Sequence, residues 1–350
     1  MRRVGLSVGA FILLALASPL LAVGLEDPPD VEVPGAAPCI IGGDACLANL
    51  ALGNGARLSY YRTFPLQPLP GTTYAGIKRA VIVIHGLSRN APGYFSYVVQ
   101  SAIVAGKLNE TIVMAPYFRP AASDARVLYW KGDGWREGEL SNDPGGGAPR
   151  MTSFHVIDVL LAMLNHQALF PDLDAIVIAG HSAGGQFTQR YAATSPAASY
   201  FAGSRFRFVV SNPSSYMYLG PERWISDRFR IPPLEVRLLC GGWDRYKYGL
   251  GGRDGYVGQL HASAIRQQYR VRDVIYLIGQ ADTGNAELDR GCEANLQGRH
   301  RYRRGVIFKD FMQTFYPGNG HRLLIVPGVG HDANQMFNSA PGRSALFGVP

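Results

Sequence analysis

Charged residues are scarce in this sequence: Asp, Glu, Lys and Arg together make up 17% of its 350 residues. Hydrophobic residues make up 47%, so the chain can bury a sizeable core, and this composition excludes an intrinsically disordered protein. Internal repeats and a second domain boundary are also absent from the sequence. We therefore expect a single domain over residues 51–350.

Long hydrophobic runs are absent after Gly24. The run before it, in MRRVGLSVGAFILLALASPLLAVG, follows two arginines and ends in small residues, which is typical of a secretory signal peptide. An uncleaved membrane anchor is the alternative, because Val4 to Val23 is about long enough to span a bilayer. We favour cleavage after Ala22 or Gly24, since no basic stop signal follows. Removal of residues 1–24 would leave no stable membrane anchor, and we expect a secreted or periplasmic protein.

Cysteine is rare, with four residues in the chain. In an exported protein these cysteines are candidates for disulfides. Cys39 and Cys46 could close a small loop in a predicted N-terminal linker, residues 25–50, which begins with a proline-rich stretch. Cys240 and Cys292 could join two long loops. Four cysteines allow three connectivities, so the sequence alone leaves the pairing open.

Recognisable cofactor motifs are also lacking. The glycine-rich stretches DPGGGAP and YGLGGRDGY do not have the spacing of a phosphate-binding or calcium-binding loop, so we predict no cofactor and no metal. The formal charge is +8, or +6 without Arg2 and Arg3, and the densest basic stretch is GRHRYRRG, residues 298–305. We interpret it as a solvated loop or helix start, with adhesion to anionic polymers or an envelope surface as the alternative. No nucleic-acid motif accompanies it, so no nucleic-acid partner is expected.

What the sequence does contain is a regular alternation of buried-strand runs and helical stretches. Helices are predicted around residues 94–105, over 152–170 with Thr152 or Ser153 as N-cap, and in GQFTQRYAATSP. Runs that are apolar at every position, with helices between them, are typical of a mostly parallel sheet covered on both faces. The strand runs are RAVIVIHG, ETIVMAPYF, IVIA, RFRFVVSNPSS, DVIYLIGQAD and HRLLIVPGVGH.

The stretch IVIAGHSAGG, residues 176–185, sets one serine between a predicted strand and a predicted helix. Ser182 is thus expected in a strained strand-to-helix turn, where the small residues Gly180 and Gly184 avoid a steric clash. Its hydroxyl would project at the carboxyl edge of the sheet, beside the amide groups of a helix N-terminus.

This pattern, Gly180-His181-Ser182-Ala183-Gly184, resembles the nucleophile elbow of the α/β-hydrolase superfamily. Four longer stretches are similar to secreted, esterase- and lipase-like members of this superfamily, whose substrates are mostly undefined. These stretches are GHSAGGQFTQRYA, VSNPSSYMYL, QADTGN and VPGVGHD. The resemblance covers about residues 75–340. It implies the α/β-hydrolase fold, with a mostly parallel central sheet, helices on both faces and long aromatic-rich loops.

A serine nucleophile needs a histidine base and a carboxylate that orients the histidine. We prefer His331 among eight histidines, because it follows the run LLIVPGVG and so should lie at the same sheet edge as Ser182. Asp282 follows the run VIYLIGQA at that edge and completes the order Ser, Asp, His of the superfamily. Asp289, on the same loop, is its rival.

The resemblance also implies an oxyanion hole made of two backbone N–H groups. Ala183, directly after the serine, matches the first donor. Leu87, after the His-Gly pair of VIVIHGLSRN, matches the second, with Ser88 as the alternative if the turn is one residue longer.

Two long loops, residues 119–150 and 214–260, are rich in tryptophan and tyrosine. Trp130, Trp135 and Tyr216 are expected to contact substrate, which favours an apolar or aromatic ester, or a polyester chain. The sequence therefore predicts a secreted serine hydrolase that cleaves carboxylic esters through an acyl-enzyme intermediate. The alternatives are an amide or peptide hydrolase with the same triad, and a non-catalytic binding protein on a hydrolase fold.

Overall fold

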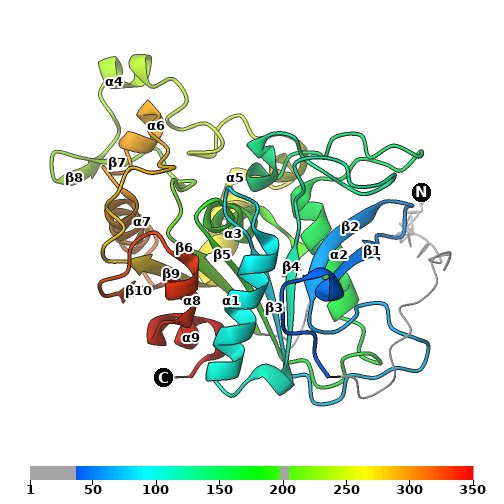
Figure 1. Cartoon of the computed structure of the whole chain (residues 1–350). Coiled ribbons are helices and arrows are strands. Elements are labelled where there is room, and N and C mark those ends of the chain that lie inside the picture. The colour runs from blue at the N-terminus through cyan, green and yellow to red at the C-terminus, as the bar shows by residue number, and fades with distance from the viewer. Residues whose placement is uncertain (1–36, 198–204, 350) are drawn as a thin grey trace, which may run out of the picture.

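The computed structural model describes residues 37–197 and 205–349. The predicted signal peptide and residues 25–36 of the predicted linker lie outside the described residues. Within the described ranges the chain forms an eight-stranded sheet flanked by helices on both faces, and a separate two-stranded sheet (Figure 1). The predicted α/β class is confirmed.

The large sheet has the strand order β1-β2-β4-β3-β5-β6-β9-β10. The six strands from β4 to β10 in that order pair in parallel, whereas β1 and β2 pair antiparallel at one edge. Short strands β7 and β8 form the two-stranded sheet. The strands are β1 (Leu47–Ala51), β2 (Arg57–Arg62), β3 (Arg79–Ile84), β4 (Thr111–Pro116), β5 (Ala175–His181), β6 (Arg205–Ser211), β7 (Arg223–Ile225), β8 (Arg228–Arg230), β9 (Asp273–Gly279) and β10 (Arg322–Val326).

Two hydrophobic cores explain why the central strands are apolar at every position. Ile178 on β5 lies opposite Ile82 on β3 and Phe208 on β6, and these side chains share one core. Val81 and Val177, also opposite each other, belong to the core on the other face of the sheet. Because side chains alternate between faces, a strand covered on both sides has no polar face.

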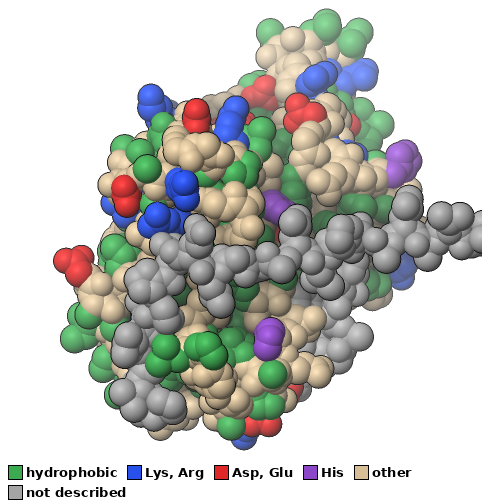
Figure 2. Space-filling model, turned by 90° about the vertical axis from the view of Figure 1, so that its right-hand side faces the viewer, with side chains coloured by type: hydrophobic (Ala, Val, Ile, Leu, Met, Phe, Trp, Pro, Cys, Tyr) green, Lys and Arg blue, Asp and Glu red, His purple; other side chains and the backbone are tan. Residues whose placement is uncertain are grey.

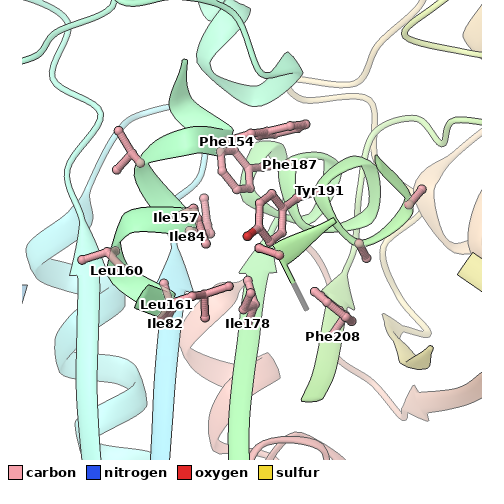
Figure 3. Close-up of a cluster of buried hydrophobic side chains, with 14 of the residues drawn as sticks. Ile82, Ile84, Phe154, Ile157, Leu160, Leu161, Ile178, Phe187, Tyr191 and Phe208 are labelled. Carbon is pink, nitrogen blue, oxygen red and sulfur yellow. The ribbon is translucent and has the colours of Figure 1, made fainter. Parts of the chain in front are cut away.

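Helices α2, α3, α5 and α7 contribute to the core that contains Ile178, and Figure 3 shows α2 and α3 packed on that face. Helices α1, α8 and α9 cover the opposite face, in front of the sheet in Figure 1. The helices are α1 (Ala91–Val104), α2 (Ser153–Leu164), α3 (Ala183–Thr194), α4 (Leu234–Leu239), α5 (Ala262–Val271), α6 (Cys292–Asn295), α7 (Arg301–Phe315), α8 (Ala333–Asn338) and α9 (Ala340–Phe347).

Most predicted elements are found, with shifted ends. Thr152 caps α2 as predicted, since its hydroxyl accepts a hydrogen bond from the backbone N–H of His155. The helix ends at Leu164 rather than at residue 170, because a turn follows it. The predicted linker over residues 25–50 needs correction, because β1 begins at Leu47 and pairs with β2 in the sheet. The β1 sequence LANLA carries only a weak strand pattern, and this pairing with β2 defines it.

Both disulfides considered from the sequence are present. Cys39 bonds to Cys46, and Cys240 bonds to Cys292, with a Cα–Cα distance of 5.5 Å in each. The second bond joins the end of α4 to the start of α6.

The two aromatic-rich loops lie at the upper end of the sheet in Figure 1, where the parallel strands end. The first runs between β4 and α2 and contains a short 3₁₀ helix, Asp133–Glu137. The second runs between β6 and α5 and contains β7, β8 and α4. None of the helices in the described ranges has the length and apolar character to cross a membrane.

Candidate active site

Ser182 occupies the sharp turn between β5 and α3. Its backbone has φ 61° and ψ −119°, a conformation that L-residues rarely adopt. A Cβ atom on Gly180 would lie 2.2 Å from the carbonyl oxygen of Gly184, and one on Gly184 would lie 2.1 Å from that of Ile84. Both positions therefore require glycine, which is the physical reason for the G-x-S-x-G spacing.

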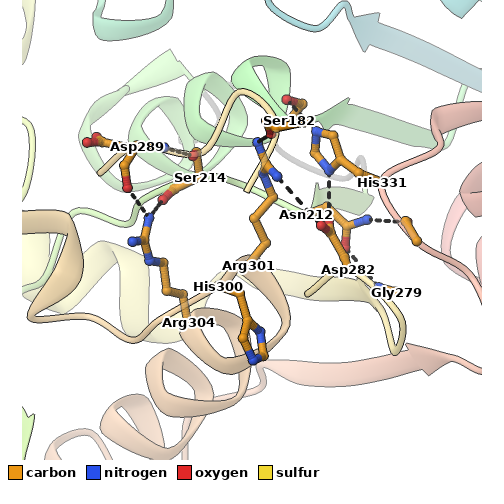
Figure 4. A network of polar contacts seen from close by, with 12 residues as sticks. Ser182, Asn212, Ser214, Gly279, Asp282, Asp289, His300, Arg301, Arg304 and His331 are labelled. Atoms are coloured by element: carbon orange, nitrogen blue, oxygen red, sulfur yellow. Dashed lines mark hydrogen bonds and ion pairs between the residues drawn. The ribbon is translucent and has the colours of Figure 1, made fainter. Parts of the chain in front are cut away.

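Three side chains from the ends of three strands form one hydrogen-bonded chain (Figure 4). The hydroxyl of Ser182 donates to Nε2 of His331 at 2.9 Å, and Nδ1 of His331 donates to Oδ2 of Asp282 at 2.7 Å. Ser182 follows β5, Asp282 follows β9 and His331 follows β10. Since these strands are parallel, the three residues meet at their common carboxyl edge. Asp282 is 1% exposed, whereas His331 is partly accessible to solvent.

Asn212, directly after β6, supports this arrangement. It was not identified as a site residue from the sequence. Its side-chain carbonyl accepts from the N–H of Gly279 at 2.8 Å, and its amide donates to the carbonyl of Gly330 at 3.3 Å. It therefore connects the end of β9 to the loop that carries His331. Its position immediately after a buried strand, at the same sheet edge, is the signal that could have found it.

The turn after β3 lies beside the serine. A Cβ atom on Gly86 would be 3.7 Å from the Cβ of Ser182, so the following residue, Leu87, begins close to the nucleophile. Leu87 is partly buried, whereas Ser88 is exposed. On the other side of Ser182, Ala183 is the first residue of α3. The N–H donor roles of Leu87 and Ala183 remain predictions.

Buried His85 stabilises the turn that contains Leu87. Its Nδ1 donates to the carbonyl of Gly86 at 2.9 Å, and its Nε2 accepts from the N–H of Phe118 at 3.2 Å. Burial lowers the pKa of His85 to about 4, so the ring is neutral at neutral pH. Arg89 extends the same support, because its guanidinium donates to the carbonyls of Phe118, Trp130 and Gly132.

Comparison with solved structures identifies proteins of similar fold. LpqC, a poly(3-hydroxybutyrate) depolymerase from Bordetella parapertussis, is similar with a TM-score of 0.61 and 21% identity, over 87% of this chain and 91% of that one. Poly(aspartic acid) hydrolase-1 from Sphingomonas sp. KT-1 is similar with a TM-score of 0.57 and 23% identity, over 84% and 96%. The chain has the α/β-hydrolase fold. No family model matches the sequence, and no curated protein matches it.

The α/β-hydrolase fold of this chain brings Asp282, and not Asp289, to the histidine. The carboxylate of Asp289 instead accepts hydrogen bonds from the Tyr248 hydroxyl at 2.8 Å and from the N–H of Gly291 at 3.1 Å. The sequence could not separate the two carboxylates, because both lie on the loop that follows β9.

The aromatic residues predicted to contact substrate are buried in the core of the fold. Trp130 is 2% exposed, and Trp135 and Tyr216 are 0% exposed. Trp135 stacks on Phe118 with ring centroids 5.4 Å apart, and Tyr216 stacks on Phe308 at 4.4 Å. The structure therefore corrects the expectation for these three side chains: they pack the loops against the hydrophobic core.

The basic stretch 298–305 contains the start of α7, in agreement with its interpretation as a helix start. Its side chains, however, are only partly exposed to solvent. Arg301 is 1% exposed and Arg304 is 0% exposed. Arg304 donates to the carbonyl oxygens of Ser214 and Asp289, while Arg301 approaches Asp282 (Figure 4). On the face drawn in Figure 2, basic and acidic side chains are interspersed in the upper half.

No metal site accompanies the serine in the part of the chain that the structure describes. Groups of three or more His, Cys, Asp or Glu side chains that could hold a metal ion are not found among these residues.

Proposed function

We propose that this protein is an exported serine hydrolase that cleaves carboxylic esters. The observation that carries the proposal is the chain of hydrogen bonds from Ser182 through His331 to Asp282, at 2.9 Å and 2.7 Å. A hydroxyl paired with an imidazole, which is itself oriented by a buried carboxylate, is an activated nucleophile. Its strained position at the sheet edge makes the hydroxyl available to a carbonyl group.

In the proposed reaction, Oγ of Ser182 attacks the ester carbonyl carbon while Nε2 of His331 takes the hydroxyl proton. The N–H groups of Ala183 and Leu87 stabilise the negative charge that develops on the carbonyl oxygen. The C–O bond to the alcohol then breaks, and His331 returns the proton to the leaving alcohol. Water, activated by the same histidine, hydrolyses the acyl-enzyme and restores Ser182. Asp282 stabilises the imidazolium in both steps.

An apolar or aromatic ester, including a polyester, stays the proposed substrate class, although the buried side chains of Trp130, Trp135 and Tyr216 do not support it. The fold neighbours suggest which polymers to test, since one is described as a poly(3-hydroxybutyrate) depolymerase and the other as a poly(aspartic acid) hydrolase. Export is supported by the disulfides Cys39–Cys46 and Cys240–Cys292, which persist in oxidising compartments.

The test is hydrolysis of p-nitrophenyl esters of increasing acyl length, together with labelling by a fluorophosphonate probe. Wild-type protein should release p-nitrophenol and be labelled at Ser182, and Ser182→Ala should lose both. Matched p-nitroanilide substrates distinguish an amidase from an esterase. Full labelling of the alanine variant, or no labelling of folded wild-type protein, would refute the proposal.

A further inference from the structure

The buried carboxylate of Asp282 has a second charged neighbour besides His331. While Oδ2 accepts the hydrogen bond from His331, Oδ1 lies 3.6 Å from Nη1 of Arg301. Both side chains of this ion pair are 1% exposed. Each charge is therefore removed from water and depends on the other for compensation.

Arg301 is held firmly where it meets the carboxylate. It is the first residue of α7, after the N-cap His300, and its Nη2 donates to the carbonyl of Ala286 at 2.8 Å. The next residue, Tyr302, donates its backbone N–H to the carbonyl oxygen of Asp282 at 3.1 Å. The first turn of α7 thus contacts Asp282 at both its backbone and its side chain.

The two carboxylate oxygens have different surroundings. Oδ1 has no hydrogen-bond partner among the described residues, so its contact with Arg301 is an attraction between charges without a donated hydrogen bond. The position of the guanidinium on the far side of the carboxylate therefore favours the orientation that serves the histidine.

We propose that Arg301 is a positioning residue of the active site: it compensates the charge of buried Asp282 and keeps its Oδ2 turned toward His331. This inference rests on the proposed function. Part of the basic stretch at the start of α7 would then act inside the protein, because Arg301 influences the reactivity of Ser182 through Asp282 and His331.

Arg304 provides a matched control for the test. It lies one turn later on α7 and is equally buried. Its guanidinium donates to the backbone carbonyls of Ser214 and Asp289, so its hydrogen bonds go to Asp289 rather than to Asp282. We therefore compare Arg301→Met, Arg301→Lys and Arg304→Met in the full-length, disulfide-bonded protein. The readouts are kcat and KM on a p-nitrophenyl ester and the rate of fluorophosphonate labelling of Ser182.

Arg301→Met should lower kcat and the labelling rate roughly 10- to 100-fold with KM within about twofold of wild type, because the loss concerns the transition state. Arg301→Lys, which keeps the charge, should recover most of both rates. Arg304→Met should stay within about threefold of wild type even if its unfolding midpoint falls. In an Asp282→Asn background, Arg301→Met should change labelling less than about twofold, since the charge it compensates is gone.

Three outcomes would overturn the inference. One is wild-type kinetics in Arg301→Met, another is an equal loss in Arg304→Met, and the third is an undiminished effect of Arg301→Met beside Asp282→Asn. If Arg301→Met does not fold by near-ultraviolet circular dichroism, Arg301→Gln compared with Arg301→Lys gives the same contrast of charge. Failure of the proposed function is distinguishable, because folded wild-type protein would then itself show neither turnover nor labelling.

Discussion

The ring of His181 lies against the ring of His331, with centroids 4.5 Å apart and planes inclined by 36°. His181 is buried, its Nδ1 pairs with the hydroxyl of Tyr94 at 3.2 Å, and its Nε2 lies 3.4 Å from the amide nitrogen of Asn212. Burial, and secondarily the charge of His331, lower the pKa of His181 well below its usual value. A neutral imidazole thus supports the ring that is proposed to carry the proton.

The two adjacent histidines should therefore respond differently to substitution. His181→Phe keeps an aromatic ring beside His331 and should retain ester turnover within about tenfold, whereas His331→Phe should lower kcat roughly 10⁴-fold or more, because it removes the base. Initial rates on a p-nitrophenyl ester measure both. Equal losses in the two folded variants would contradict the assignment of the base to His331 alone.

Asp282→Asn should lower kcat roughly 10³- to 10⁴-fold, since an amide cannot stabilise the imidazolium and favours the wrong tautomer of His331. Asp289→Asn is the control on the same loop, because its carboxylate contacts Tyr248 and Gly291 instead. That variant should keep kcat within about threefold of wild type. The reverse ranking would reassign the acid to Asp289.

Gly184→Ala should destabilise the protein by about 3 kcal/mol and abolish labelling of Ser182, because the new methyl group meets the backbone oxygen of Ile84 at 2.1 Å. Gly320→Ala is the matched control, since a Cβ atom there has nothing within 4 Å. It should change the free energy of unfolding by less than about 0.5 kcal/mol. Urea denaturation measures both changes, and an unaffected Gly184→Ala variant would argue against the close packing of the elbow.

The protein should lose stability as the pH falls from about 6.5 to about 4, partly because of His321. Burial lowers the pKa of His321 from 6.5 to about 4, and its ring accepts from the Tyr276 hydroxyl and donates to the carbonyl of Tyr269, each at 2.8 Å. Between these pH values the unfolded chain binds a proton that the folded chain does not. Complete titration would therefore lower the free energy of unfolding by about 3 kcal/mol.

His321→Gln should reduce this pH dependence by close to one proton, although His85, whose pKa burial also lowers to about 4, continues to contribute. Urea denaturation at several pH values between about 7 and 4.5 gives the slope. An unchanged slope in a folded His321→Gln variant would show that this histidine titrates normally in the folded state.

Loss of the Cys240–Cys292 bond should cost more stability than loss of Cys39–Cys46. Their sequence separations are 52 and 7 residues, so chain entropy predicts losses of about 4 and about 2 kcal/mol for the respective paired serine variants. Loss of the Cys240–Cys292 bond should also lower turnover, because Cys292 belongs to the segment that joins Asp282 to α7. Peptide mapping of non-reduced protein checks the pairing, and a free Cys240 thiol would contradict it.

The sequence by itself determined the parallel core of the sheet and the shortlist of residues at its carboxyl edge. Hydrophobic periodicity is a local property, so runs such as RAVIVIHG and IVIA identify buried strands without knowledge of their partners. The turn at Ser182 is local in part: Gly180 meets the backbone of Gly184 four residues later, whereas Gly184 meets the backbone of Ile84 on β3. Residues that follow parallel strands lie at one edge, which brought Ser182, Asp282 and His331 into consideration together.

Only the tertiary structure decided which side chains face one another and which face water. Asp282 and Asp289 share a loop, and their hydrogen bonds to His331 and to Tyr248 depend on contacts made across strands far apart in the chain. The antiparallel strands β1 and β2 likewise depend on their pairing.

Arg301 lies in a basic stretch that was interpreted as solvated, and Trp135 was expected to contact substrate. Both side chains are buried in the structure. A residue's burial depends on the elements that pack over it, and that information is distributed over the whole chain. The physical reason is that propensity and periodicity act between near neighbours in sequence, whereas burial and ion pairing act between neighbours in space.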